Sequence, residues 1–325
     1  MKTLCAALFV LLFVHLQILG ADLRIGIIGL DTSHCTEFTR RFNDSNDKNH
    51  VPGGKVVAAF RGGSPDIKES WSRVEEYTKQ LQEKYGVLIV ESIEELCSQV
   101  DVVMLESVDG RPHLQQAIPV FNAKKTLFID KPVAGSLRDA IEIFRLAKER
   151  SVPCFSASSL RYYPTIDELK NGGIGELKGA ISVGPAHKEP HHPDLFWYGI
   201  HPTEALFTVM GTGCESVVRT ATADTDVVTG IWKDGKVGTL RGLRNASEPY
   251  RMTVFGSKAV LDKKLEGDYT PFLREVMKFF QTGIAPVSPE ETLEIFAFME
   301  AADESKRQGG CPVKISDVMK KAGRK

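Results

Sequence analysis

The sequence predicts an α/β fold in which a doubly wound parallel sheet is followed by an α+β domain with an open, mainly antiparallel sheet. From residue 23 to about 158, short apolar segments alternate with amphipathic ones across short connections, which is typical of a parallel sheet with right-handed crossovers. After residue 177, short β-rich segments are separated by turn signals such as Asp234-Gly235. A chain of 325 residues, 42% of them hydrophobic, is long enough for two such domains.

Residues 1–21 differ in kind from the rest of the chain. Lys2 carries the only charge, and residues 4–19 are almost wholly apolar. This segment is short for a membrane span of about 20 residues, and small residues end it, which favours a secretory signal peptide. The alternative is an uncleaved anchor, and both predict an exported protein, periplasmic or secreted. We therefore expect a signal peptide at 1–21, a dinucleotide-binding domain at 22–158 and a substrate and oligomerisation domain at 159–325.

The charge balance and the cysteines exclude several classes of protein. A net charge of -1 gives no reason to expect nucleic acid as a partner. One of the six cysteines lies in the signal segment, the others are scattered, and no C-x-x-C occurs, which argues against a disulfide framework or a zinc–thiolate site.

The first predicted strand, residues 23–28, runs through Gly29 into a helix, as in a dinucleotide-binding βα turn. In G-x-G-x-x-G register, however, Asp31 takes the second glycine position and His34 the third. The fingerprint is incomplete because two of its glycines are missing, and the carboxylate of Asp31 would repel a pyrophosphate. The predicted cofactor contacts in this turn are Gly29, Thr32, Ser33 and His34.

The remaining elements of the first half follow from periodicity and from caps. Strands are expected at residues 55–60, 87–90, 100–105, 126–129 and 153–156, and helices at 67–85, 92–99, 112–122 and 136–150. Arg61 follows the second strand, where an arginine suits the 2′-phosphate of NADP and an acid would suit NAD. An exposed loop arginine is an equally good interpretation. In the second half we expect strands at 177–184, 215–220, 227–232, 236–240, 251–255 and 258–261, and helices at 270–282 and 289–308 that return to the first domain.

Several motifs recur in an order and spacing that point to one family. Asp130-Lys131-Pro132 follows the fifth strand, and His113 lies a few residues past the fourth. An Arg161-aromatic-Pro segment, the run 174–177 and Gly199-Ile200-His201 come next. In this order the chain resembles the glucose–fructose oxidoreductase / inositol dehydrogenase (Gfo/Idh/MocA) family, over nearly all of residues 22–325.

The resemblance implies an NAD(P)-dependent oxidoreductase that moves a hydride between a nicotinamide and a sugar or polyol. Lys131 would contact cofactor and substrate and, as a cation, stabilise a developing alkoxide, while a neutral His201 at a helix start would accept the proton. The cofactor would be NADP or NAD, with NADP slightly favoured by Arg61. The expected substrate contacts are His113, Arg161, Trp197, Tyr198 and Glu204, with Glu204 alternatively orienting His201. The open sheet face implies a homo-oligomer.

Two other functions stay open at this point. The broken fingerprint and the export signal favour a cofactor-free descendant that binds carbohydrate. The run from His187 to Glu204, rich in histidines and acids, would suit a lyase or hydrolase. Its spacing matches no H-E-x-x-H pattern, so we expect no metal there.

Overall fold

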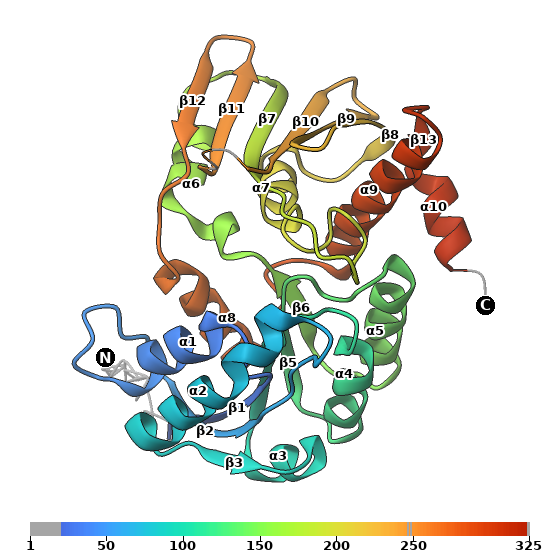
Figure 1. The fold of residues 1–325 in the computed structure, drawn as a ribbon. Helices are drawn as coiled ribbons and strands as arrows, with labels where there is room; N and C mark the ends of the chain where they lie inside the picture. Colours follow the sequence, from blue (N-terminus) through green and yellow to red (C-terminus); the bar gives the residue numbers. More distant parts are fainter. Residues whose placement is uncertain (1–20, 246, 248, 324–325) are drawn as a thin grey trace, which may run out of the picture.

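The computed structural model describes residues 21–245, 247 and 249–323, and its first half is a six-stranded parallel sheet (Figure 1). The strand order is β3-β2-β1-β4-β5-β6, and every pair of neighbours is parallel. The strands are β1 (Leu23–Ile28), β2 (Gly54–Phe60), β3 (Leu88–Val90), β4 (Val102–Leu105), β5 (Thr126–Asp130) and β6 (Cys154–Ala157). The order reverses between β1 and β4, the point at which such sheets bind ligands. The predicted doubly wound fold is confirmed.

Five helices cover the two faces of this sheet. They are α1 (Ser33–Asn43), α2 (Lys68–Tyr85), α3 (Ile93–Gln99), α4 (His113–Asn122) and α5 (Leu137–Glu149). Three of them begin at a side-chain cap, because Thr32, Ser92 and Ser136 each accept a hydrogen bond from a backbone N–H of the first turn. Gly86 ends α2 in the left-handed conformation.

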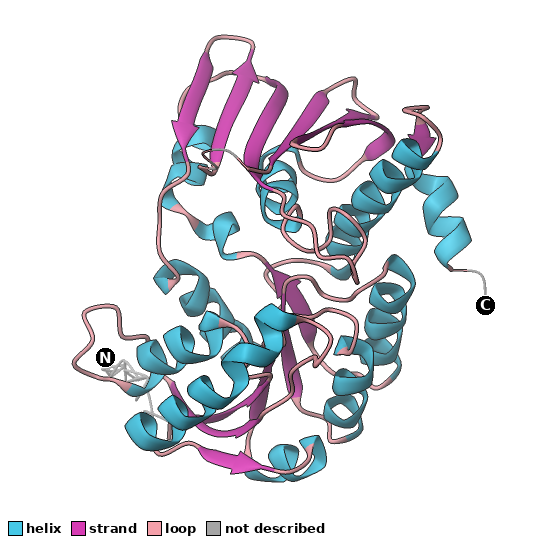
Figure 2. Cartoon of the chain, in the orientation of Figure 1, coloured by secondary structure: helices cyan, strands magenta, loops and turns pink. Residues whose placement is uncertain are grey.

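The second half forms a seven-stranded sheet in the order β12-β11-β7-β10-β9-β8-β13 (Figure 2). Only β7 and β10 run parallel, so the predicted mainly antiparallel sheet is confirmed. Its strands are β7 (Leu177–Pro185), β8 (Cys214–Ala221), β9 (Thr225–Trp232), β10 (Val237–Leu243), β11 (Arg251–Gly256), β12 (Val260–Lys264) and β13 (Val313–Lys314). The accompanying helices are η1 (Ser159–Tyr162), α6 (Pro164–Asn171), α7 (Ile200–Met210), α8 (Thr270–Thr282), α9 (Pro289–Arg307) and α10 (Ile315–Ala322).

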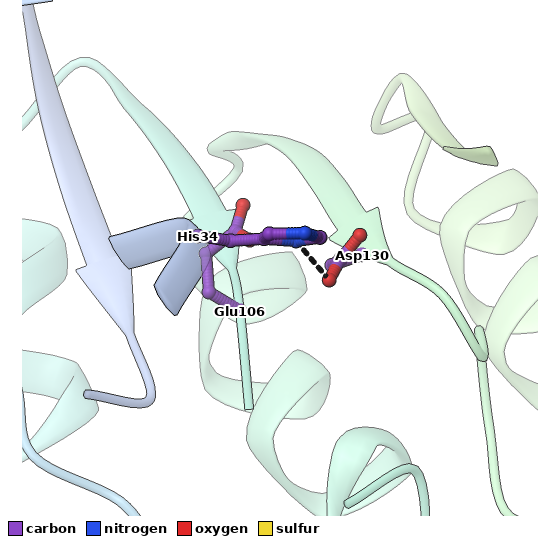
Figure 3. A group of neighbouring side chains, drawn as sticks. All are labelled: His34, Glu106 and Asp130. Atoms are coloured by element: carbon purple, nitrogen blue, oxygen red, sulfur yellow. Dashed lines mark hydrogen bonds and ion pairs between the residues drawn. The ribbon is translucent and has the colours of Figure 1, made fainter. Parts of the chain in front are cut away.

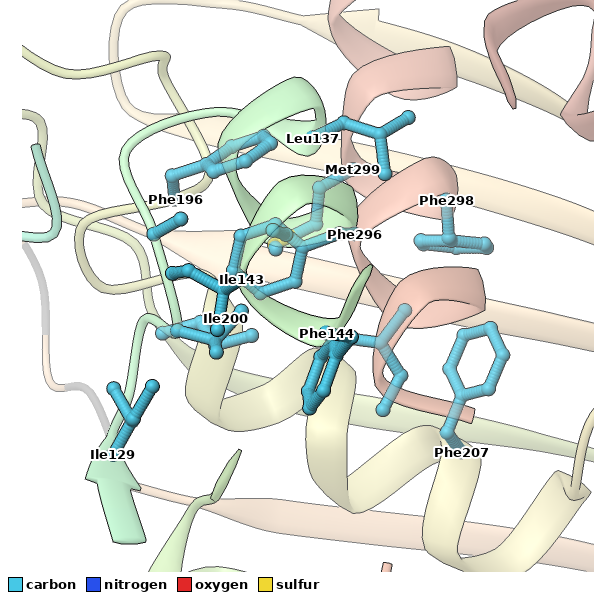
Figure 4. Close-up of a cluster of buried hydrophobic side chains, with 14 of the residues drawn as sticks. Ile129, Leu137, Ile143, Phe144, Phe196, Ile200, Phe207, Phe296, Phe298 and Met299 are labelled. Carbon is cyan, nitrogen blue, oxygen red and sulfur yellow. The ribbon is translucent and has the colours of Figure 1, made fainter. Parts of the chain in front are cut away.

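A continuous apolar core joins the two sheets and fixes their relative position. Side chains from β5, α5, α7 and α9 interdigitate in it (Figure 4). Phe207 of α7 stacks edge-on against Phe298 of α9, and Phe196 packs against Phe296 in the same way. Helix α8 packs instead on the first sheet, where Phe272 contacts Phe128 of β5. Residues at the end of β5 and at the start of α7 are therefore held at a fixed distance.

The proposed signal segment lies almost entirely in residues 1–20, outside the described residues. Among the helices of the described part, none has both the length and the apolar character that crossing a membrane requires.

Candidate active site

A cavity of about 230 Å³ lies at the carboxyl ends of the first sheet's strands and is lined from both halves of the chain. Its walls are mostly polar and aromatic. The lining residues are Thr32, Ser33, His34, Glu69, Arg73, Val108, Lys131, Ser159, Leu160, Tyr163, Trp197, Tyr198, His201, Tyr250 and Tyr269. Both predicted catalytic side chains are in this set, although 70 residues of sequence separate Lys131 from His201.

Lys131 directly follows β5, and its side chain is 13% exposed. Its Nζ lies 3.9 Å from Oδ2 of Asp130, the last residue of that strand. The ammonium group therefore lies beside a carboxylate and lines the cavity.

His201 lies in the first turn of α7, and its Nδ1 is 2.8 Å from the hydroxyl oxygen of Ser158. Burial lowers the pKa of His201 well below its usual value, and the positive charge of Lys131 lowers it further. The imidazole is consequently neutral near pH 7. The prediction that Glu204 could orient this ring is wrong, because Ser158 occupies the orienting position.

Asp31 does not face the cavity, which corrects the expectation that its carboxylate would repel a phosphate. The side chain is fully buried; Oδ2 accepts a 2.6 Å hydrogen bond from Ser70 and Oδ1 a 3.1 Å bond from the backbone N–H of Val108. Burial raises the pKa of this carboxyl group. Asp31 thus ties the β1 turn to α2 and to the segment after β4, and leaves the start of α1 open.

His34 lines the cavity at the start of α1 and points toward the end of β5 (Figure 3). Its Nδ1 lies 2.7 Å from Oδ2 of Asp130, and its ring stacks on Phe38 at 4.8 Å. Although burial opposes ionisation of Asp130, the neighbouring His34 and Lys131 charges lower the pKa of that carboxyl. Asp130 is therefore an anion at neutral pH, held between an imidazole and an ammonium group.

The predicted substrate contact of His113 is not found, because this side chain is completely buried in α4. Its Nε2 lies 2.9 Å from the carbonyl oxygen of Ser107 and its Nδ1 3.3 Å from that of Val133. Burial lowers the pKa of this histidine. His113 joins the segments that follow β4 and β5, and does not line the cavity.

Arg161 and Glu204 were also predicted to bind substrate, and the structure pairs them with each other instead. The guanidinium of Arg161 donates to the carboxylates of Glu204 and Glu291, and its side chain is 8% exposed. Neither Arg161 nor Glu204 lines the cavity. This triad links η1, α7 and α9 and so holds in place the elements that carry Ser159 and His201.

Replacing Arg161 with methionine is therefore expected to lower the free energy of unfolding by about 3–5 kcal/mol, because Glu204 would stay buried without its cation. Urea denaturation measures this loss. The double variant Arg161→Met/Glu204→Gln should recover part of it. A single variant that is as stable as the wild type but loses substrate affinity would restore the substrate-binding interpretation.

Trp197 and Tyr198 line the cavity as the sequence predicted, whereas the neighbouring Phe196 belongs to the core. The ring of Tyr198 lies 5.8 Å from that of His201, and the ring of Trp197 lies 5.0 Å from that of His192. Trp197, Tyr198 and His201 form one wall of the cavity.

The other polar residues of the run from His187 to Glu204 do not form one site. His191 is bonded to Glu189, and His192 contacts Asp109 of the first half at 2.7 Å. Each group therefore has a partner of its own, and the run offers no common ligand position.

Two charged lining residues were not predicted from the sequence. Glu69 and Arg73 lie one helical turn apart on α2, paired at 2.8 Å, and both line the cavity next to the start of α1. The sequence offers no local signal for them, because an acidic and a basic residue four positions apart are common on the solvent-exposed face of any helix. Arg61, in contrast, is exposed and does not line the cavity.

The start of α1 suits a phosphate, and the space beside Gly29 is already filled. Gly29 has a φ of 93°, and a Cβ there would lie 2.4 Å from the backbone nitrogen of Ser107. The cavity opens one turn further on, where Ser33 and His34 begin the helix and the Glu69–Arg73 pair lies on the same wall. These residues fit an anionic group at α1 and a ring-sized group beside Lys131.

Comparison with known families matches residues 23–158 to a family described as an oxidoreductase family with an NAD-binding Rossmann fold. Among curated proteins, the oxidoreductase YceM of Salmonella typhimurium is 27% identical over 125 residues. That match covers 37% of this chain and 40% of the relative's length.

Solved structures share the fold over nearly the whole chain. A protein from Thermotoga maritima, described as a probable dehydrogenase, is 23% identical with a TM-score of 0.73 and covers 91% of this chain and 100% of its own. The myo-inositol 2-dehydrogenase of Lactobacillus plantarum is 16% identical with a TM-score of 0.73, covering 90% and 99%. At such identities the likeness establishes the common architecture.

Proposed function

Because residues 23–158 belong to the oxidoreductase family with an NAD-binding Rossmann fold, we propose that this protein moves a hydride between a nicotinamide cofactor and a sugar or polyol. The observation that carries the proposal is that Lys131, from the first sheet, and His201, from the second half, line one cavity. A cation and a neutral base that line the same cavity are what oxidation of a carbinol needs.

The phosphates of the cofactor would be held at the start of α1, beside Thr32 and Ser33, with the Glu69–Arg73 ion pair on the same wall of the cavity. When bound, the nicotinamide takes up or supplies the hydride. The slight preference for NADP over NAD comes from the sequence alone, since Arg61 at the end of β2 is exposed and does not line the cavity. One observation supports this placement. The carboxylate of Asp31, which would repel a phosphate, accepts hydrogen bonds from Ser70 and Val108 and does not line the cavity.

Two residues share the work of catalysis: His201 would accept a proton and Lys131 would stabilise negative charge. In the tautomer that carries its proton on Nδ1, His201 donates to the Ser158 oxygen, and Nε2 can accept the substrate's hydroxyl proton. Nζ of Lys131 donates to the same oxygen as negative charge develops on it. Trp197 and Tyr198 offer ring faces to a sugar or polyol, and the named activity of one structural relative, a myo-inositol dehydrogenase, is on a polyol.

We expect NADP or NAD to raise the melting temperature of the protein, and a subset of sugars and polyols to change the absorbance of the nicotinamide. The experiment uses the chain purified without an affinity tag and a panel of aldoses, ketoses and inositols. Arg61→Ala should weaken NADP binding and spare NAD. Absence of binding by both dinucleotides would overturn the proposal.

A second candidate is a cofactor-free carbohydrate-binding protein, and the packing of Ser107 against Gly29 favours it. It predicts that sugars bind without a dinucleotide and equally well in Lys131→Ala. The third candidate, a lyase or hydrolase built on the run from His187 to Glu204, has less support, because those side chains have separate partners.

Export and self-association complete the proposal. The apolar N-terminal segment supports a periplasmic or secreted location. The second sheet exposes Ile231, Val237 and Val260 on its strands, and such apolar side chains suit contact with a second copy of the chain.

A further inference from the structure

Three potential metal ligands converge beside the cavity, at the ends of three different elements (Figure 3). His34 comes from α1, Glu106 follows β4, and Asp130 ends β5. Nδ1 of His34 lies 2.7 Å from Oδ2 of Asp130 and 3.9 Å from Oε2 of Glu106. One ligand atom from each of the three lies within 4.8 Å of the others, and no other group in the described part of the chain does this.

Glu106 is the unusual member of this group. Its side chain is completely buried, and neither carboxylate oxygen has a hydrogen-bond partner among the described residues. Asp31, the other buried acid at these strand ends, is held by Ser70 and Val108. A buried carboxyl group without a partner is costly, so an unpaired one next to an imidazole and a second carboxylate indicates a missing cation.

We propose that His34, Glu106 and Asp130 bind a divalent transition-metal ion, Zn²⁺ or Mn²⁺. One imidazole with two carboxylates suits these ions better than a site of oxygen ligands alone. Bonds of about 2.0–2.2 Å to a tetrahedral ion place two ligand atoms roughly 3.4 Å apart. The observed separations of 2.7 and 3.9 Å bracket this value, so small side-chain rotations complete the site.

His34 is the one of the three ligands that lines the cavity, together with Lys131 and His201, so the ion would lie directly behind this part of the cavity wall. Three protein ligands with one open position are typical of a catalytic ion. A water or a substrate hydroxyl would bind there and be acidified beside His201. The inference does not depend on a dinucleotide. It departs from the sequence analysis, which predicted no metal site.

The test is metal analysis of the full chain, purified without an affinity tag and dialysed against Zn²⁺ or Mn²⁺. We expect one ion per chain, a rise in melting temperature with either metal alone, and visible absorption when Co²⁺ is bound. Glu106→Gln keeps the shape of the side chain and should lower metal affinity by about 100-fold or more. Asp130→Asn is the second variant, in case the first does not fold.

His191→Ala is the matched control, because this exposed histidine pairs with Glu189 away from the three ligands. It should bind the metal like the wild type. If the wild type retains no ion and none of the three metals changes its melting temperature, or if Glu106→Gln binds as tightly as the wild type, the site does not exist. A dinucleotide that still raises the melting temperature of metal-free protein would leave the proposed function standing in that case.

Discussion

Replacing Lys131 with methionine is expected to lower kcat by about 10²- to 10³-fold, the usual effect of removing one group that stabilises a developing oxyanion. The ammonium group lines the cavity, its side chain is 13% exposed, and its nearest carboxylate is Asp130 at 3.9 Å. Methionine keeps the length of the side chain but removes the charge. Turnover of the best sugar or polyol substrate, followed by nicotinamide absorbance, measures the change.

Lys125→Met is the matched control, because Lys125 lies just before β5, at the opposite end of the strand from Lys131. It removes an equal charge far from the cavity and should leave kcat unchanged. If the two variants have the same kcat, Lys131 is not the catalytic cation. If instead sugars bind both variants equally and no dinucleotide is turned over, the cofactor-free function gains support.

The fold was predictable because its signals are local. Buried strands read as apolar runs, and the caps Thr32, Ser92 and Ser136 mark helix starts within a few residues of their partners. Short connections between them leave one reasonable topology for the first half. Similarly, Lys131 was recognisable because it stands at a strand end, where an open α/β sheet places its ligands.

The errors came from contacts between residues far apart in the sequence. Asp31 looked like a carboxylate aimed at a phosphate, but its partners Ser70 and Val108 lie 39 and 77 residues away. Arg161 looked like a sugar ligand, yet Glu204 neutralises it from 43 residues away. Charged side chains take their roles from such partners, and no local pattern specifies them.

The metal ligands were missed for the same reason. His34 was assigned to a cofactor because it occupies a glycine position of the fingerprint, and its contact with Asp130 spans 96 residues. Glu106 directly follows β4, and this position alone says nothing about its partners. What makes it informative is that burial leaves both of its oxygens without a partner.

Replacing His201 with glutamine is expected to lower kcat by about 10²- to 10⁴-fold, because glutamine cannot accept the substrate's proton. Burial lowers the pKa of His201 well below 6.5, so the folded wild type keeps a neutral base where an ordinary histidine would be charged. The acidic limb of the kcat/KM profile should therefore lie below pH 6.5. The glutamine variant should lose that limb together with most of its activity.

Stability gives an independent readout of the same group. Below about pH 6.5 the unfolded chain takes up a proton at His201 while the folded chain does not, so the stabilisation present above that pH is lost as the pH falls. His201→Gln should flatten part of this dependence in urea denaturation between pH 7 and pH 5. His113→Gln is the control: that histidine also has a lowered pKa but lies outside the cavity, so this variant should flatten the stability curve and keep kcat. Equal kcat values for the two variants would show that His201 is not the base of the reaction.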